Sequence, residues 1–341
     1  MSLHLPRRRF GVLVAALLVA LTAGCGAADP SPASNTKPGS GTSAADQTRV
    51  FAADNGDITI PTKPQRVVAT GYAVPVLIEA DAPLVGISSW QRGLPMMTAA
   101  DRKTYRNLRK IAGETADTTN YEAIAAAKPD LIVIGVPAPV LGDIDMDRLA
   151  EIAPVVAIGP SLPKDWRTLS RRQADAAGRF DYYQAAKASY EKKAAKLREK
   201  YADVLDGMRF GHLGAYGEAA KGTFQREFSG SWGTNIAEDV GNTYYGEVAK
   251  KQGGSSDVSE YPAMEAIPQS FKEADAITYT LENDGSTSDS VQSVLDSRLW
   301  KNLPAVQNDQ VFGLRYTEAA TYESAERTLD EIDKALAPLL P

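Results

Sequence analysis

The chain has 341 residues, of which 37 are Lys or Arg and 43 are Asp or Glu, so its formal net charge is −6 at neutral pH. A chain of this length can bury enough apolar surface to fold without disulfides or metal ions, although length alone does not distinguish one domain from two. The acidic balance disfavours nucleic acid and anionic membrane surfaces as partners.

Residues 1–24 are expected to form a signal peptide that is removed on export. Three arginines precede a nearly apolar stretch, residues 10–21, that is too short to span a membrane comfortably. The following LTAGC resembles a bacterial lipobox, in which Cys25 would be lipidated, for example with palmitate. Cys25 is the only cysteine, so the chain cannot form an internal disulfide. Because RRRF half-matches a twin-arginine signal, both export routes, Sec and twin-arginine, stay open.

Residues 25–48 combine the lipidation site with a segment rich in Ser, Ala, Pro, Gly and Thr, which we expect to be a flexible linker. From residue 66 onwards, short apolar runs of strand length alternate with helical or loop segments. This alternation is typical of a mostly parallel sheet covered by helices. The predicted strands are Val67–Thr70, Leu84–Ile87, Leu131–Ile134 and Val155–Ile158.

A long helix is predicted over residues 181–206, where Gly and Pro are absent and apolar residues recur on one face. At 1.5 Å per residue it would be about 39 Å long. Strand-like runs then resume at Phe210–Leu213, Ala276–Tyr279 and Val311–Leu314. The sequence therefore predicts an α/β protein with an N-terminal lobe (49–180), a connecting helix (181–206) and a C-terminal lobe (207–341).

Signals for catalysis are weak in this chain. His212 is the only histidine outside the predicted signal peptide, and it lies in a strand-like segment, where a buried ring with satisfied nitrogens is the common situation. One histidine and no spare thiol provide neither a zinc ligand set nor a good basis for a Ser-His-Asp triad. We therefore assign no catalytic residue and do not expect an enzyme.

Aromatic and arginine side chains follow several of the predicted strands. The carboxyl ends of parallel strands are where α/β proteins bind ligands. Any one loop aromatic can simply cap a hydrophobic edge, and any one arginine can simply be solvated. Several at the same edge favour a site for a bulky, partly polar ligand, because rings cover apolar parts and arginine binds oxygen pairs. The candidates are Tyr72, Trp90, Arg92, Tyr216, Arg226, Trp232, Tyr279, Arg315 and Tyr316.

Five segments, taken in order and spacing, resemble the ABC-transporter substrate-binding lipoproteins for iron siderophores and cobalamin. They are RVVATGYAVPVLIEADAPLVGIS (66–88), IAGETADTTNYEAIAAAKPDLIVIG (111–135), LAEIAPVVAI (149–158), ADAITY (274–279) and LWKNLPAVQNDQVFGL (299–314). The resemblance runs from Arg66 to the C-terminus and is weakest over residues 216–260. It implies two Rossmann-like lobes joined by one long helix. A ligand would bind unchanged in the cleft between the lobes and pass to a permease coupled to an ATPase.

The resemblance also implies that one glutamate on each lobe forms salt bridges with permease arginines. The matching residues are Glu122, at the start of the helix before PDL, and Glu265, which lies between two prolines in the second lobe. Glu122 has a second interpretation, since TNYE is a capping-box pattern in which Glu122 would bond back to the start of its helix. The two roles are compatible, because the first turn of such a helix is exposed.

A ferric siderophore is the expected ligand, with a hydroxamate of the ferrioxamine type favoured. The chain itself is expected to hold no metal directly and no cofactor, because a free-metal receptor needs several imidazoles and carboxylates together. We expect a monomer on the outer face of the cytoplasmic membrane, in contact with the membrane through its lipid only. Catecholates, ferric citrate, haem and corrinoids stay open as ligands, and Tyr216 or Tyr279 could bind haem iron. A siderophore-opening extracytoplasmic hydrolase is the remaining alternative.

Overall fold

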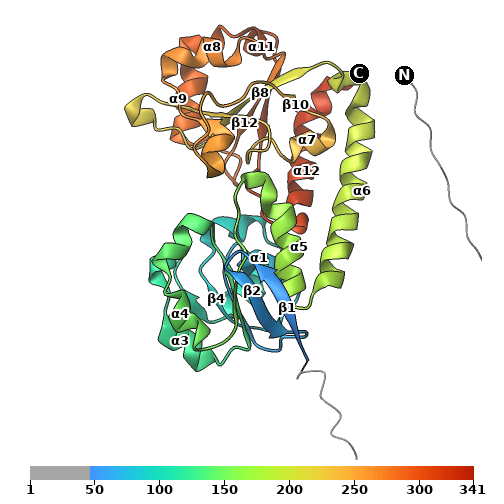
Figure 1. The fold of residues 1–341 in the computed structure, drawn as a ribbon. Coiled ribbons are helices and arrows are strands. Elements are labelled where there is room, and N and C mark those ends of the chain that lie inside the picture. The colour runs from blue at the N-terminus through green and yellow to red at the C-terminus, as the bar shows by residue number, and fades with distance from the viewer. Residues whose placement is uncertain (1–46) are drawn as a thin grey trace, which may run out of the picture. The chain divides into compact units, whose positions relative to one another are not determined.

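Two α/β lobes follow one another along the chain, and one long helix lies between them in sequence (Figure 1). The computed structural model describes residues 47–341, which belong to one compact unit. The predicted signal peptide, the lipidation site Cys25 and nearly all of the predicted linker lie outside the described residues. The α/β architecture with a long helix is confirmed.

The first lobe is built on a five-stranded sheet in the order β5-β4-β3-β6-β7, and all of its strand pairs are parallel. Its apolar runs are buried because helices cover both faces of the sheet. The strands are β3 (Val67–Gly71), β4 (Leu84–Ser88), β5 (Lys110–Ala112), β6 (Leu131–Gly135) and β7 (Val155–Ala157). The helices are α1 (Ala73–Glu79), α2 (Ala99–Asn107), α3 (Tyr121–Ala127), α4 (Met146–Ala150) and α5 (Trp166–Ala176).

An antiparallel hairpin of β1 (Thr48–Ala53) and β2 (Gly56–Pro61) precedes this sheet and was not predicted. Its turn contains Asn55-Gly56, a pair that favours tight hairpins because glycine adopts positive φ, here 112°. The Asn55 side chain also bonds the backbone of Val155 and Ala157 at 3.0 and 2.8 Å. The hairpin is thereby attached to the edge strand β7.

The long helix α6 (Phe180–Leu205) has 26 residues, which confirms the predicted connecting helix to within one residue at each end. One face of α6 is buried, with Tyr183, Tyr190, Leu197 and Tyr201 repeating at helical spacing. This face packs against α5, α7 (Ala237–Val240) and α12 (Tyr322–Leu336). Helix α6 is therefore in contact with helices of both lobes.

The second lobe has a mixed sheet in the order β11-β9-β8-β12-β13, with β10 also paired to β8. Strands β8, β10, β12 and β13 pair in parallel, whereas β9 and β11 are antiparallel to their neighbours. The strands are β8 (Arg209–Gly214), β9 (Gln225–Glu227), β10 (Thr243–Tyr244), β11 (Ser259–Glu260), β12 (Ala276–Thr280) and β13 (Val311–Leu314). The further helices are α8 (Ile267–Phe271), α9 (Asp289–Asp296), α10 (Arg298–Lys301) and α11 (Pro304–Gln307).

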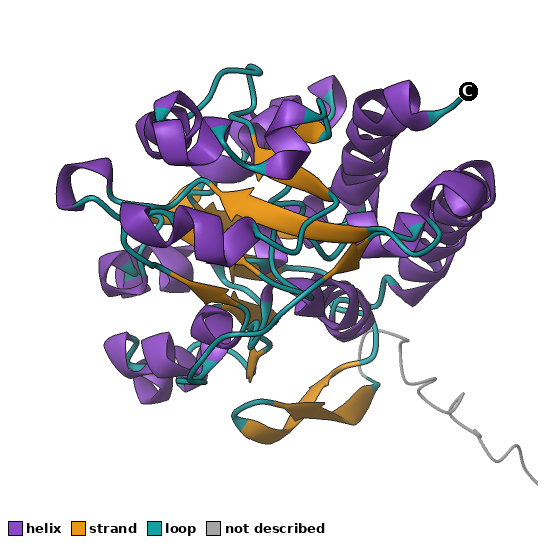
Figure 2. Cartoon of the chain, turned by 90° about the horizontal axis from the view of Figure 1, so that it is seen from above, coloured by secondary structure: helices purple, strands orange, loops and turns teal. Residues whose placement is uncertain are grey.

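Helices surround most of the strands when the protein is viewed from above, and a two-stranded hairpin lies outside them at the lower edge of the view (Figure 2). Short 3-10 helices occupy many connections: η2 (Gln91–Met96), η3 (Ala116–Thr118), η4 (Ala138–Asp143), η5 (Pro163–Asp165), η6 (Ala219–Lys221), η7 (Gly254–Asp257), η8 (Met264–Ala266) and η9 (Ala337–Leu339). Within residues 47–341, none of the helices combines the length and the apolar character that a membrane crossing requires.

Candidate ligand-binding site

Aromatic side chains from both lobes line a cavity of about 280 Å³. Tyr72 directly follows β3 and Trp90 follows β4, so both lie at carboxyl ends of first-lobe strands, whereas Trp232 comes from the connection between β9 and α7. The rings of Tyr72 and Trp232 are parallel within 3°, with centroids 6.2 Å apart. Tyr72 and Trp90 meet edge to face at 4.9 Å. The two lobes therefore bring a set of rings to one place, as ligand sites of α/β proteins require.

Arg92, in η2, adds a positive charge to this cavity. Its guanidinium carbon lies 4.2 Å from the ring centroid of Trp90 and 4.8 Å from that of Tyr72. Among residues 47–341, Arg92 forms no salt bridge. The ring faces thus hold a guanidinium whose N–H donors are available to ligand oxygens.

Glu318 supplies the one negative charge among the residues that line the cavity. It follows β13, and its carboxylate accepts a hydrogen bond from the hydroxyl of Tyr216. Burial raises the pKa of the Glu318 carboxyl, and the nearby Arg92 opposes this rise. Sequence reasoning missed Glu318 because it selected rings and arginines at strand ends. Its place four residues after β13 was a signal that could have found it.

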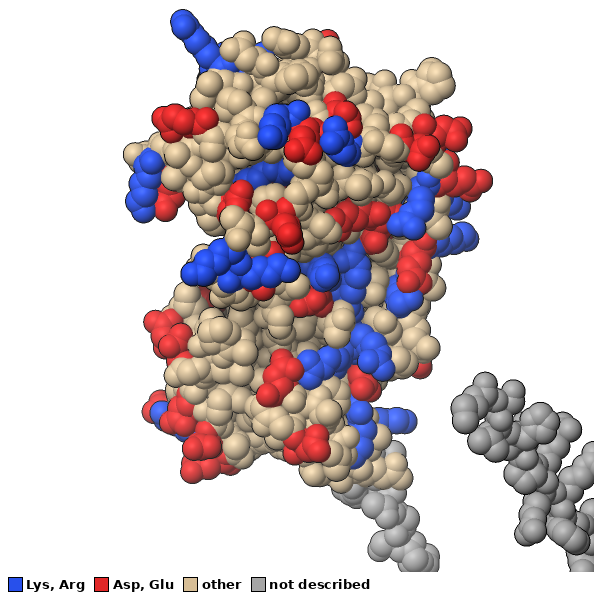
Figure 3. All heavy atoms as spheres, turned by 45° about the horizontal axis from the view of Figure 1, so that its top comes forward, with Lys and Arg blue, Asp and Glu red and all other residues tan. Residues whose placement is uncertain are grey.

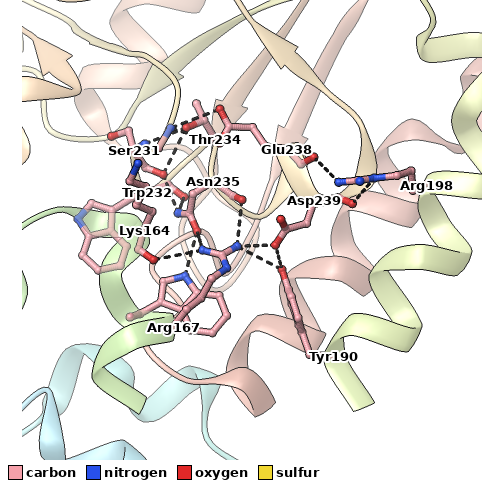
Figure 4. Close-up of polar contacts among 12 residues, drawn as sticks. Lys164, Arg167, Tyr190, Arg198, Ser231, Trp232, Thr234, Asn235, Glu238 and Asp239 are labelled. Atoms are coloured by element: carbon pink, nitrogen blue, oxygen red, sulfur yellow. Dashed lines mark hydrogen bonds and ion pairs between the residues drawn. The ribbon is translucent and has the colours of Figure 1, made fainter. Parts of the chain in front are cut away.

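Trp232 lies in a turn that is held from the other lobe (Figure 4). Within the turn, the Asn235 side-chain amide donates to the carbonyl of Ser231 at 2.6 Å. The Asn235 Oδ1 atom accepts hydrogen bonds from Trp166 Nε1 and Arg167 Nη1, each at 2.9 Å. Trp166 and Arg167 begin helix α5 of the first lobe. The placement of the Trp232 ring therefore depends on contacts that cross between the lobes.

A buried carboxyl group supports the same turn from inside the second lobe. The backbone N–H of Gly233 donates to Glu227 Oε2 at 2.7 Å, and Glu227 is only 2% exposed. Burial raises the pKa of Glu227 to about 7. A Cβ atom at position 233 would lie 1.9 Å from the imidazole Nε2 of His212, so only glycine fits there. Glycine at position 233 therefore lets the turn that carries Trp232 pack closely against the buried His212 ring.

His212 itself is fully buried in β8 and bonds to second-lobe hydroxyls. Its Nδ1 and Nε2 atoms lie 2.7 and 3.1 Å from the hydroxyl oxygens of Thr278 and Thr280. Burial is the main cause that lowers the pKa of His212 to about 3, so the ring is neutral at physiological pH. The prediction of a buried histidine with satisfied nitrogens is confirmed. His212 is not among the residues that line the cavity.

Five of the predicted site residues line the cavity, and four do not. The five are Tyr72, Trp90, Arg92, Tyr216 and Trp232. A sixth, Tyr316, lines an adjoining hollow of about 390 Å³ that shares Arg92, Tyr216 and Glu318 with the cavity. Tyr279 packs instead against the core of the second lobe, and Arg315 pairs with Glu331 at 2.8 Å. We therefore propose neither Tyr279 nor Arg315 as a ligand contact.

Arg226 is a further departure from the expected site, because its guanidinium is buried. Arg226 is 1% exposed and donates to the carbonyls of His212, Glu227 and Tyr245 at 2.6–3.2 Å. The ring of Phe271, on α8, is one of three that lie about 5 Å from it. The sequence interpretation placed Arg226 in a loop, but it lies within the short antiparallel strand β9. Its side chain donates to backbone oxygens inside the second lobe and is buried, so we do not propose Arg226 as a ligand contact.

Residues 69–316 match the family described as periplasmic binding protein. The chain belongs to this family. It is 27% identical over 284 residues to the iron(3+)-hydroxamate-binding protein YxeB of Bacillus subtilis, covering 81% of each chain. It is 24% identical over 333 residues to the iron(3+)-hydroxamate-binding protein FhuD of the same organism, covering 94% of this chain and 96% of the relative.

Solved structures share the fold of this periplasmic binding protein. The siderophore periplasmic binding protein from the fuscachelin gene cluster of Thermobifida fusca superimposes with a TM-score of 0.65 and 26% sequence identity. The match covers 82% of this chain and 98% of the Thermobifida chain. The two proteins therefore share a fold over most of this chain and nearly all of the Thermobifida chain.

The predicted docking glutamates of this periplasmic binding protein are both exposed. Glu122 lies in the first turn of α3, and Glu265 lies in η8. The capping-box interpretation of Glu122 was wrong in its geometry. Asn120 caps α3 by accepting from the Ala123 N–H at 2.9 Å, whereas the Thr119 hydroxyl donates to the carbonyl of Ala116. Among residues 47–341, no group of three or more His, Cys, Asp or Glu side chains is arranged to hold a metal ion.

Proposed function

We propose that this protein is an extracytoplasmic receptor for a ferric hydroxamate siderophore of the ferrioxamine type. The observation that carries the proposal is the composition of the cavity: several rings, one guanidinium and one carboxylate. A ferric tris-hydroxamate is neutral at the metal, whereas a ferric tris-catecholate carries three negative charges. Enclosing a trianion with a single cation, Arg92, and a carboxylate, Glu318, would leave charge uncompensated in a partly dry site. The names of two relatives, both iron(3+)-hydroxamate-binding proteins, support the same choice.

The proposed ligand contacts follow from this arrangement. The rings of Tyr72, Trp90 and Trp232 would cover the apolar linkers of the siderophore, and Arg92 would donate to hydroxamate oxygens. Tyr216 and Tyr316 would contact the ligand from the second lobe. The metal arrives inside the chelator, so it needs no protein ligand. The proposal assigns no side chain as a nucleophile or as a general base, so the ligand would be released chemically intact.

Delivery to a membrane transporter is the second part of the proposal. Glu122 and Glu265, one on each lobe, would form salt bridges with arginines of an ABC-transporter permease, whose ATPase drives uptake. The protein would act as a monomer attached to the outer face of the cytoplasmic membrane through a lipid on Cys25. Receptor and permease would then stay close together on the same membrane.

A titration of intrinsic tryptophan fluorescence tests the proposed ligand. The protein from Ala45 onwards, which contains every described residue, is titrated with ferric hydroxamates, ferric catecholates, ferric citrate, haem, cobalamin and the iron-free chelators. We expect saturable quenching by ferric hydroxamates at sub-micromolar concentration and a weaker response to the other members. Saturation by haem with a Soret band, or by a catecholate alone, would contradict the hydroxamate proposal. Recovery of a cleaved chelator would indicate a hydrolase instead.

A further inference from the structure

The ligand cavity continues into a second hollow on the side of Glu318. This hollow, of about 390 Å³, shares Arg92, Met96, Tyr216 and Glu318 with the cavity and adds Glu282 and Tyr316. Together the linings of the two hollows hold one cationic side chain, Arg92, and two carboxylates. With one cation against two carboxylates, the linings of the two hollows do not form a basic site of the kind that selects anions. On the face shown in Figure 3, Lys and Arg side chains form a row across the middle of the protein, with Asp and Glu side chains beside it.

The two carboxylates differ in their surroundings. Glu282 is exposed and solvated. Glu318 is partly buried, and the single hydrogen bond to its carboxylate among residues 47–341 comes from Tyr216. No Lys or Arg of the described residues lies within salt-bridge distance of Glu318. An enclosed ligand would thus meet a carboxylate that has acceptor capacity left and whose negative charge has no partner in direct contact.

We propose that Glu318 makes the cleft selective for ferric complexes that carry a primary ammonium group over complexes with the same iron centre that lack one. The inference rests on the proposed function, since it requires a ferric hydroxamate in the cavity lined by Tyr72 and Trp232. The neutral iron centre lies against the rings, and the ammonium end reaches Glu318 where the cavity opens into the second hollow. The rings of Tyr216 and Tyr316 line this part and offer faces that attract cations.

The physical basis is a charge-assisted hydrogen bond formed in a partly enclosed place. An ammonium group offers three donors to the free acceptor positions of the Glu318 carboxylate. The opposite charge also favours the ionised carboxylate, which burial by itself disfavours. A complex with a neutral amide at this end loses the attraction, and one with a carboxylate there meets repulsion.

The test uses three complexes with one iron centre and different terminal charges. Ferrioxamine B carries a free primary ammonium group, its N-acetyl derivative is neutral at that end, and its N-succinyl derivative is anionic. We expect Kd, measured by tryptophan quenching, to rise in this order, with ferrioxamine B bound about five- to tenfold more tightly than the N-acetyl complex. In Glu318→Gln, the three Kd values should approach that of the N-acetyl complex. In Glu282→Gln, an exposed carboxylate of the same hollow, the wild-type ratio should persist.

Each other outcome counts against the proposal. Equal Kd values for the three complexes in the wild-type protein would overturn it and leave the proposed function standing. The wild-type comparison does not depend on whether any variant folds. If Glu318→Gln lowered the affinity for all three complexes by the same factor, the role of Glu318 would be limited to positioning Tyr216. No binding of any of the three would overturn the proposed function and this inference with it.

Discussion

Arg167, in the first lobe, donates a hydrogen bond of 2.9 Å from its Nη1 atom to the side-chain oxygen of Asn235, in the second lobe (Figure 4). The Nη2 atom of Arg167 also donates to the backbone oxygen of Asn235 at 3.1 Å and pairs with Asp239. The Asp239 carboxylate in turn accepts from the Tyr190 hydroxyl of α6 at 2.5 Å. The turn that carries Trp232 is thereby attached to the first lobe and to the long helix.

Replacing Arg167 by Met should therefore weaken ligand binding even though Arg167 does not line the cavity. The variant loses the hydrogen bonds to Asn235 and leaves Asp239 without its cation. We expect the free energy of unfolding to fall by about 1–2 kcal/mol, and the affinity for ferrioxamine B to fall about fivefold because the Trp232 turn is less well held. Chemical unfolding and tryptophan quenching measure the two effects.

Arg172→Met provides the matched control for this prediction. Arg172 also lies on α5 and pairs with Asp54 at 2.6 Å, with a side-chain exposure of 25% against 26% for Arg167. Both partners of this second pair lie in the first lobe. The control should lose stability to a similar extent and keep its ligand affinity. Equal affinity losses in both variants would show that the effect is general destabilisation and has no relation to Trp232.

The four tryptophans occupy different places, so their variants should separate ligand contact from packing. Trp90 and Trp232 line the cavity, whereas Trp300 is 3% exposed in the core of the second lobe. Trp90→Phe and Trp232→Phe should each remove part of the ligand-induced quenching and raise Kd severalfold, because each loses ring area at the site. Trp300→Phe should lower stability and keep the full fractional quenching. A loss of quenching in Trp300→Phe alone would place the ligand elsewhere.

The raised pKa of Glu227 should make the stability of the folded protein depend on pH. Burial raises it from 4.5 to about 7, so the folded protein keeps a proton that the unfolded chain releases above pH 4.5. The contribution of Glu227 to stability is complete below pH 4.5 and is lost as pH rises through about 7. Glu227→Gln cannot lose this proton and can still accept from Gly233. The free energy of unfolding of the variant should exceed that of the wild type between pH 5 and pH 8, by up to roughly 3 kcal/mol. Urea unfolding at several pH values measures the difference, and parallel pH profiles would contradict the assignment.

The parts of the fold that sequence predicted are those with long, uninterrupted patterns. Local sequence is enough to predict an element when its apolar pattern is long and regular. This holds for the apolar runs of β3, β6 and β12 and for the repeating tyrosines of α6, which are largely buried in the structure. Strands β9, β10 and β11 have two or three residues each and form only because neighbouring strands supply partners. Their existence depends on tertiary contacts, which local sequence patterns do not contain.

The candidate site was predictable to the same limited degree. Tyr72 and Trp90 follow parallel strands, so the strand-end rule placed them correctly at the cavity. Arg226 was misplaced because β9 was not recognised, and a side chain within an antiparallel strand obeys a different geometry. Glu318 was missed although it lines the cavity together with Arg92, because which charges share the cavity depends on how the lobes come together. The sequence thus predicted that aromatic residues and arginine would line the cavity, but it did not predict the carboxylate that shares the cavity with them.

Reversing the charge of both predicted docking residues should abolish uptake and leave binding intact. Glu122 and Glu265 are exposed and neither lines the cavity, so Glu122→Arg combined with Glu265→Arg should keep the wild-type Kd for ferrioxamine B. Like charges would then face the permease arginines, which costs far more than losing an exposed salt bridge. Uptake of radioactive iron as ferrioxamine B by cells that depend on this receptor measures the effect.

A control variant makes the same change of net charge at other exposed positions. It combines Glu151→Arg with Glu199→Arg, and cells that carry it should take up iron normally. Normal uptake by the first double variant would exclude these two glutamates as the docking pair, and failure of both double variants would attribute the loss to net charge.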